Sequence, residues 1–149
     1  MSKMILLVED DATDVKLTLR AFNKANVANE IFVVRDGAEA LDYLFATGQY
    51  ASRNVDALPT ITLLDLQLPR VDGLEVLRRI RADERTKHLA VVILTSSKEE
   101  EDVARGYALG ANAYVRKPVD FSDFIVAAQT LGLFWLLLNE PAPPHRPVR

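Results

Sequence analysis

The stretch from Ile61 to Gly73 constrains the fold of this chain more than any other part of the sequence. Residues 61–64 form an apolar run without polar alternation, which is typical of a strand covered on both faces in a parallel sheet. The run ends at Asp65, and the turn and helix-start residues Pro69 and Gly73 follow. Open α/β sheets place their chemistry at the carboxyl ends of strands, which makes Asp65 a candidate functional residue. A lone aspartate in this place could equally be a simple loop cap.

Strand-like and helix-like patterns alternate five times along the chain with short connections. This alternation predicts an α/β fold with a doubly wound, five-stranded parallel sheet and an extended last helix. The expected strands cover residues 4–8, 31–34, 61–64, 90–94 and 113–115. Residues 47–59 have no clear period and are expected to form a long surface loop. We predict one domain over residues 1–139 and a disordered, proline-rich tail over residues 140–149.

The helix after the first strand is expected to begin at a cap provided by Thr13 or Asp14. Its apolar stripe, formed by Val15, Leu19 and Phe22, is expected to face the sheet.

Composition excludes several classes of function. The apolar fraction of 49% and the charged fraction of 26% are those of an ordinary soluble globular protein. A net charge of -3 offers no electrostatic attraction for nucleic acid or for an acidic membrane surface. The absence of cysteine excludes disulfides, thiolate metal sites and cysteine nucleophiles. Because no signal peptide is present and the longest apolar run, Leu133 to Leu138, is too short to span a bilayer, we expect a cytoplasmic protein.

Polar side chains follow four of the expected strands, and in a parallel sheet these strand ends share one rim. They are Glu9 with Asp10, Asp65, Thr95 and Lys117. Three carboxylates repel one another unless a cation lies among them, and a hard dication such as Mg²⁺ suits their oxygen atoms. Carboxylate, magnesium, lysine and hydroxyl together are what phosphoryl transfer requires, with Asp65 as the nucleophile that forms an aspartyl phosphate.

These residues resemble the receiver domains of two-component response regulators, from Met4 to about Leu133. The resemblance is carried by four motifs: residues 8–11 (VEDD), residues 64–69 (LDLQLP) with 72–73 (DG), residues 94–96 (LTS), and Tyr114 with Lys117-Pro118. It implies the flavodoxin-like (βα)5 fold of that family. The long loop before the third strand and the Phe134-Trp135 ending further resemble small single-domain regulators that pair with phytochrome-type histidine kinases.

The resemblance implies a metal site and a phosphoryl acceptor. Asp65 accepts a phosphoryl group from a kinase histidine. Asp10 and Asp65 ligate Mg²⁺ directly together with the backbone carbonyl of Gln67, and Glu9 acts through water. Lys117 pairs with the phosphoryl group or, at rest, with Asp65.

The resemblance also implies a conformational switch and a backbone feature. Thr95 bonds a phosphoryl oxygen, and Tyr114 then turns inward behind it. The Lys117–Pro118 bond is expected to be cis. Gln67 and Ser97, each two residues past a site residue, are expected to flank the phosphoryl group and tune its hydrolysis. His88 and His145 are expected to be exposed and without chemistry.

The output expected from the resemblance is protein binding, or phosphoryl relay to a downstream effector, without nucleic acid or membrane. The protein would not be an enzyme beyond its own phosphorylation and dephosphorylation. One alternative is a pseudo-receiver that serves only as an interaction module, although such proteins lose the acids or the lysine that this chain keeps. Another is a magnesium-dependent phosphatase of the haloacid dehalogenase type, which needs a second aspartate where this chain has Gln67.

The last helix predicts a homodimer. Phe121, Phe124 or Ile125, Ala128, Leu131 and Trp135 form the apolar stripe expected to pack on the sheet. Residues 133–138, however, are apolar on every side of the helix, and the sheet can cover only one side. We expect a second copy to cover the remainder, which includes Phe134, Trp135, Leu137 and Leu138, because twofold interfaces are self-complementary. In the alternative, the helix folds back over its own domain.

Overall fold

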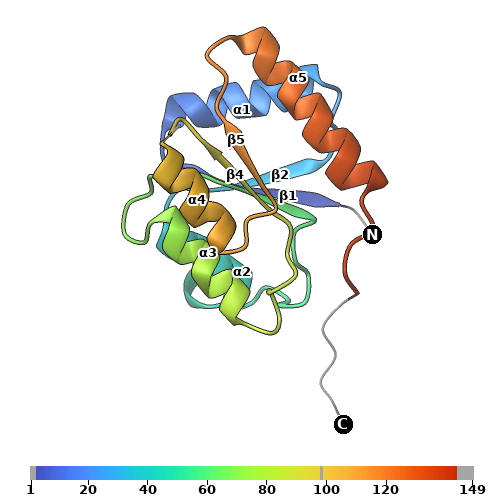
Figure 1. The fold of residues 1–149 in the computed structure, drawn as a ribbon. Coiled ribbons are helices and arrows are strands. Elements are labelled where there is room, and N and C mark those ends of the chain that lie inside the picture. The colour runs from blue at the N-terminus through green and yellow to red at the C-terminus, as the bar shows by residue number, and fades with distance from the viewer. Residues whose placement is uncertain (1–2, 98, 144–149) are drawn as a thin grey trace.

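A five-stranded parallel sheet forms the centre of the structure, a computed structural model that describes residues 3–97 and 99–143 (Figure 1). The strands are β1 (Met4–Val8), β2 (Glu30–Val34), β3 (Ile61–Leu64), β4 (Val91–Thr95) and β5 (Ala113–Arg116). Their order is β2-β1-β3-β4-β5, and every neighbouring pair is parallel. The chain reverses its direction of winding between β1 and β3, which is where such sheets bind ligands. The predicted fold is confirmed.

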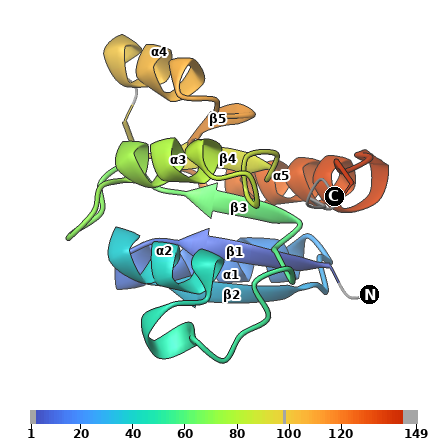
Figure 2. The ribbon, with the colours of Figure 1, turned by 90° about the horizontal axis from the view of Figure 1, so that it is seen from below.

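Helices cover both faces of the sheet (Figures 1 and 2). They are α1 (Ala12–Lys24), α2 (Gly37–Phe45), α3 (Gly73–Ala82), α4 (Glu100–Ala108) and α5 (Phe121–Leu131). The first and last lie together on one face, and α2, α3 and α4 lie on the other. Within the predicted surface loop, the structure has a single short 3-10 helix, η1 (Gly48–Tyr50).

Two hydrophobic cores result, one on each face of the sheet. Along β1, Leu6 and Val8 pack beneath α2 and α3, while Ile5 and Leu7 pack beneath α1 and α5. Burying each such side chain contributes roughly 1.5–3 kcal/mol. This two-sided burial explains why the strands are mostly apolar, with Thr62 in β3 as a buried exception, and why charged side chains gather at the strand ends.

The start of α1 differs from the prediction. Asp11 is the N-cap, and its side chain accepts a hydrogen bond from the backbone of Asp14 at 3.0 Å. The helix therefore begins before Thr13, so that neither Thr13 nor Asp14 caps it. The buried stripe also differs, because Leu19 is exposed and Thr18 is buried in its place.

The last helix continues without interruption as a π-helix, η2 (Gly132–Leu138). The π-helix has i→i+5 hydrogen bonds, and its wider turn changes which residues face the sheet. The buried positions are Phe124, Ala128, Gly132 and Leu136, each four residues after the last. The predicted stripe packs on the sheet: Trp135 is half-buried against the same core as Phe124 and Ala128, and Leu136 beside it is fully buried as well.

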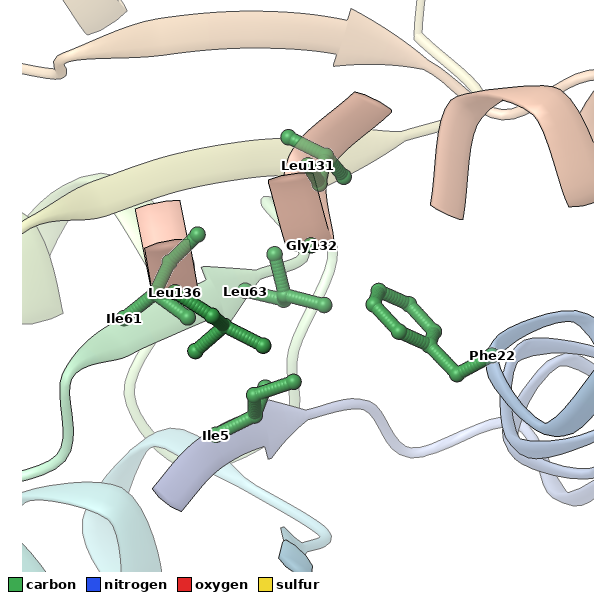
Figure 3. A pocket seen from close by; sticks show the side chains of 7 residues that line it. All are labelled: Ile5, Phe22, Ile61, Leu63, Leu131, Gly132 and Leu136. Carbon is green, nitrogen blue, oxygen red and sulfur yellow. The ribbon is translucent and has the colours of Figure 1, made fainter. Parts of the chain in front are cut away.

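Leu136 closes the end of the core between the sheet and α1 (Figure 3). Its side chain lies over β1 and β3, in an apolar pocket that Ile5, Phe22, Ile61, Leu63, Leu131 and Gly132 also line. The helix thus folds back over its own domain through one of its faces. Leu133, Phe134, Leu137 and Leu138 remain exposed by 54%, 47%, 74% and 67%.

The helical segment Phe121–Leu138 is also, by length and composition alone, apolar enough to cross a membrane. The unbroken apolar run of residues 133–138 is only the last part of this segment. Phe124, Ala128 and Leu136 anchor one face of this segment to the domain core, and 28% of the segment is buried. The predicted tail lies partly outside the described residues: 140–143 are irregular, and 144–149, with His145, are not described.

Candidate functional site

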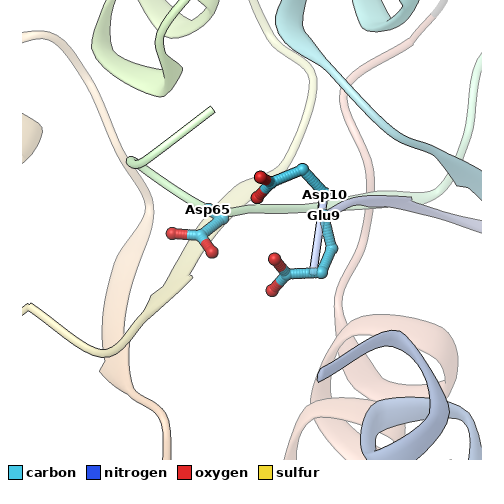
Figure 4. A group of neighbouring side chains, drawn as sticks. All are labelled: Glu9, Asp10 and Asp65. Carbon is cyan, nitrogen blue, oxygen red and sulfur yellow. The ribbon is translucent and has the colours of Figure 1, made fainter. Parts of the chain in front are cut away.

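Three carboxylates meet at the carboxyl ends of β1 and β3 (Figure 4). Oxygen atoms of Glu9, Asp10 and Asp65 all lie within 4.8 Å of one another. Glu9 and Asp65 are buried, whereas Asp10 is exposed at the rim. The structure therefore brings together the acidic residues that the sequence predicted.

Lys117 supplies the positive charge at this rim. It follows β5, and its backbone N–H donates to the carbonyl of Thr95 at 2.7 Å. Its Nζ donates to Asp65 Oδ2 and to Asp14 Oδ2, each at 2.9 Å, and also to Glu9 Oε1. Burial alone would lower the pKa of the ammonium group, but the hydrogen bonds to these carboxylates raise it, so Lys117 stays charged.

The predicted cis bond before Pro118 is wrong. No cis peptide occurs among the residues that the structure describes, so the Lys117–Pro118 bond is trans. The trans form is the more stable one by about 0.5–1 kcal/mol for an X–Pro bond. With the trans bond, the Lys117 side chain already reaches the carboxylates of Glu9, Asp14 and Asp65.

Asp65 is held by three donors. Besides the bond to Lys117, its Oδ1 accepts from Thr95 Oγ1 at 2.9 Å and from the backbone N–H of Gln67 at 3.2 Å. Burial by itself would raise the pKa of Asp65, but the bonds from Lys117, Thr95 and Gln67 outweigh it and hold the pKa below its usual value. The carboxylate is therefore ionised and oriented, as a nucleophile requires.

The pKa of Glu9 is shifted in the opposite direction to that of Asp65. Desolvation by burial, with a further contribution from the nearby Asp65 charge, raises the pKa of Glu9 to about 7 despite its bond to Lys117. One ammonium thus faces more carboxylate charge than it neutralises. A divalent cation with oxygen ligands would relieve this excess, and the hard donor set of Glu9, Asp10 and Asp65 fits such an ion.

A second set of polar contacts runs from Thr95 towards α4. The backbone N–H of Ser97 donates to Thr95 Oγ1 at 3.4 Å, and the Ser97 hydroxyl donates to Asp102 Oδ2 at 2.6 Å. Tyr114 is half-buried, and its hydroxyl donates to the Ser97 carbonyl at 2.9 Å. Thr95, Ser97 and Tyr114 are therefore linked by consecutive hydrogen bonds.

Close backbone packing shapes the loop between β3 and α3. A Cβ atom on Gly73 would lie 2.2 Å from the carbonyl oxygen of Asp65, so only glycine lets α3 begin this close to the site. A Cβ atom on Gly37 would likewise lie 1.8 Å from the carbonyl oxygen of Val71, which shows that the turn before α2 packs directly on this loop. An open groove next to the acidic cluster is lined by this loop, by Asp10 and by Asp102.

Asp14 is the site residue that sequence reasoning missed, because it was considered only as a helix cap. Its side chain is about one-third exposed and bonds Lys117 from the first turn of α1. The available signal was its spacing: Asp14 lies one helical turn past Asp10, on the helix that starts at the same rim.

The fold and this rim define a class of protein in which an oriented aspartate at a strand end carries the chemistry. Residues 5–129 match the response regulator receiver domain family. Rcp1 from Synechocystis sp., a response regulator, is 37% identical over 134 residues, covering 90% of this chain and 89% of Rcp1. The Mn²⁺-bound structure of Rcp1 superposes with a TM-score of 0.84 at 35% identity, covering 95% of this chain and 99% of the other.

Two further solved structures are similar over nearly the whole chain. The phosphorylated cyanobacterial phytochrome response regulator RcpA has a TM-score of 0.87 at 36% identity, covering 96% of this chain and all (100%) of RcpA. The bacteriophytochrome response regulator RtBRR has a TM-score of 0.78 at 52% identity, covering 96% of this chain and 86% of RtBRR. The chain therefore belongs to the response regulator receiver domain family. Receiver-domain regulators are in general soluble, non-enzymatic signalling proteins that pair with histidine kinases.

Proposed function

We propose that this protein accepts a phosphoryl group on Asp65 from a histidine kinase and passes the signal on through protein–protein contacts. The observation that carries the proposal is the environment of the Asp65 carboxylate. It is held at 2.9 Å by both Lys117 and Thr95, beside Glu9 and Asp10. The pseudo-receiver and phosphatase alternatives are not favoured, because every acid and the lysine are present and Gln67 offers no general acid.

In the transfer, an Asp65 carboxylate oxygen forms the new O–P bond while the N–P bond of the kinase phosphohistidine breaks. The histidine leaves as an imidazole that takes up a proton. Lys117 then turns one N–H from Asp65 to a phosphoryl oxygen, and the Thr95 hydroxyl does the same. Both donors are already within hydrogen-bond distance of Asp65, so little rearrangement precedes the reaction.

The metal is proposed to be Mg²⁺, held by Asp10, Asp65 and the backbone carbonyl of Gln67, with Glu9 acting through water. When bound, such an ion neutralises charge on the phosphoryl oxygens. The chain's own contribution is to gather hard oxygen donors at one rim beside an open groove.

The signal is proposed to leave the site through Thr95 and Tyr114. The phosphoryl charge attracts the Thr95 hydroxyl away from Ser97, to which it is bonded. The Ser97 carbonyl accepts a hydrogen bond from the Tyr114 hydroxyl, so a displacement of Ser97 releases the ring to move inward. Binding of beryllium trifluoride should then shift the amide signals across residues 96–110 and around Tyr114. Shifts confined to the immediate neighbours of Asp65 would contradict the switch.

Gln67 and Ser97 are proposed to tune phosphoryl hydrolysis. Gln67 is exposed beside the groove. The Ser97 hydroxyl is bonded to Asp102, which also lines the groove.

The kinase is proposed to be of the phytochrome type, since RcpA and RtBRR are phytochrome and bacteriophytochrome response regulators. We place the protein in the cytoplasm and its output on an effector or phosphotransfer protein.

Acetyl phosphate labelling tests the acceptor. We expect wild-type protein to gain one phosphoryl group, detected by mass spectrometry, and Asp65→Asn to gain none while keeping its fold. Asp56→Asn is the matched control, because Asp56 is exposed in the loop that enters β3 at its amino end, opposite the carboxyl ends that form the rim. Full labelling of Asp65→Asn would place the nucleophile elsewhere.

We further propose that the protein is a homodimer joined through the exposed face of α5 and η2. Leaving four large apolar side chains in water would forgo roughly 1.5–3 kcal/mol each at full burial. Between Phe121 and Leu138 the only charged residue is Asp123, so two copies of this surface can meet without charge repulsion. Phe134, Trp135, Leu137 and Leu138 are the proposed contact residues, and Phe134 and Trp135 already pack edge to face with ring centroids 4.9 Å apart.

Light scattering on size-separated protein tests the dimer. We expect a wild-type dimer at micromolar concentration and monomers for both Phe134→Glu and Leu137→Glu. Gln129→Glu places the same charge at an exposed polar position of α5 and should remain dimeric. A wild-type monomer, or dimers that survive both apolar-to-glutamate changes, would refute the proposal.

A further inference from the structure

We propose that Asp14 is a positioning residue that holds the Lys117 ammonium in place while Asp65 is phosphorylated. The inference rests on the phosphoryl acceptance proposed above. It assigns a role in the reaction to a carboxylate that stands outside the acidic cluster of Glu9, Asp10 and Asp65.

The hydrogen bonds of Lys117 are the first part of the argument. An ammonium group has three N–H donors and no acceptor. Lys117 Nζ donates to three carboxylates, those of Glu9, Asp14 and Asp65, so each donor has an acceptor. The Lys117 side chain is only 8% exposed, which leaves little room for water to replace a lost partner. Loss of one carboxylate therefore leaves a buried donor without its bond, which is costly.

The second part concerns which partners stay available during the reaction. Asp65 loses its full negative charge when it becomes an aspartyl phosphate. A divalent cation bound at the cluster of Glu9, Asp10 and Asp65 would neutralise part of the negative charge that Glu9 offers to Lys117. Asp14 takes part in neither change, so it is the partner that retains its charge for Lys117 at each stage. The other two N–H groups can then turn to new acceptors without the ammonium leaving the site.

The third part is the rigidity of Asp14 itself. Its backbone N–H donates to Asp11 Oδ1 at 3.0 Å, and its carbonyl accepts from the hydroxyl of the buried Thr18 at 2.7 Å. The residue is thus fixed in the first turn of α1 from both sides. A side chain on a rigid backbone orients its partner better than one on a mobile loop.

The test measures the rate of Asp65 phosphorylation by phosphoramidate in MgCl2, as a function of donor concentration, for the full chain. We expect Asp14→Asn to lower the saturating rate roughly tenfold. Removal of a group that directly contacts the developing charge lowers the rate more, by about 10²–10³-fold. The half-saturating donor concentration should change little. Asp14→Glu should recover part of the rate, because it restores a carboxylate. Asp123→Asn removes an exposed first-turn acid from α5 that is not one of the three carboxylates bonded to Lys117, and it should behave as wild type.

A second measurement separates positioning from a purely structural role. The Lys117 ammonium protons, detected by NMR, should exchange slowly with water in the wild type and faster in Asp14→Asn. A structural role alone would lower the midpoint of thermal unfolding and leave both the rate and the proton exchange of the folded protein unchanged. Wild-type rate and exchange in Asp14→Asn would overturn the inference. Failure of wild-type protein to label at Asp65 would instead overturn the proposed function.

Discussion

The hydroxyl of Thr62 is buried at the centre of the sheet, and its oxygen has no hydrogen-bond partner among the described residues. Thr62 lies in β3, next to Leu6 of β1 and Val91 of β4. Thr86 offers a comparison, because it is equally buried but its hydroxyl donates to the carbonyl of Ile80 at 2.6 Å. The two threonines differ in whether the buried hydroxyl is satisfied.

Valine has nearly the shape of threonine and replaces the hydroxyl with a methyl group. Burying a hydroxyl without a hydrogen bond costs about 1–3 kcal/mol in proteins. Thr62→Val removes this cost and adds apolar contact with Leu6 and Val91, so we expect the free energy of unfolding to rise by about 1–2 kcal/mol. Thr86→Val breaks a satisfied bond and should lower the free energy of unfolding by about 1–3 kcal/mol.

Urea unfolding followed by circular dichroism measures both changes. The midpoint should move up for Thr62→Val and down for Thr86→Val with unchanged m-values, because neither replacement alters the surface exposed on unfolding. In thermal unfolding, 1 kcal/mol corresponds to roughly 2–4 °C for a domain of about this size. A neutral or destabilising effect of Thr62→Val would show that the hydroxyl is satisfied in solution, and the reasoning would fail.

Three further predictions concern the packing of Gly73, the ion pairs of Glu75 on α3 and the metal. Gly73→Ala should lower the free energy of unfolding by roughly 1–3 kcal/mol in urea, because the new Cβ atom meets the Asp65 carbonyl oxygen at 2.2 Å, and unchanged stability would contradict that packing. Hydrogen bonds from Arg78 and Arg79 lower the pKa of Glu75 to about 2, so its stabilisation is present above pH 4.5 and lost as the pH falls towards 2. In Glu75→Gln, the midpoint of thermal unfolding at low salt should therefore depend less on pH between pH 4.5 and pH 2. The same pH dependence as in the wild type would count against the pairing. Chelation of divalent cations should abolish acetyl phosphate labelling, and labelling that persists in EDTA would disprove the metal requirement.

Much of the fold followed from strand patterns in the sequence. A parallel sheet buried on both faces demands unbroken apolar runs, so residues 61–64 could be placed and Asp65 located at the end of β3. Parallel strands also bring their carboxyl ends to one rim, which is why Glu9, Asp10 and Lys117 could be expected beside it.

Other features depend on geometry that a pattern of residue types does not contain. In the last helix, Leu136 is fully buried and Trp135 only half-buried, and a run that is apolar at every position does not distinguish the two. Asp11 caps α1 instead of Thr13 or Asp14, because the helix begins two or three residues earlier than the apolar pattern suggested. That shift leaves the Asp14 side chain free of capping, and its contact with Lys117 joins residues 103 positions apart.

The packing of Gly37 against Val71 has a consequence for building chimeric regulators. The turn before α2 and the loop before α3 are separate in the sequence, yet their backbones are in direct contact, and Arg70 Nη1 also bonds Asp36 Oδ2 at 3.4 Å. A graft that imports only the loop from a relative would meet a foreign surface at Gly37. The two segments must therefore be transplanted as a pair. The loop of residues 47–59 is likewise tied to α2, because Tyr50 donates to Glu39 Oε2 at 2.6 Å and Arg53 Nε donates to the Tyr43 carbonyl at 2.7 Å.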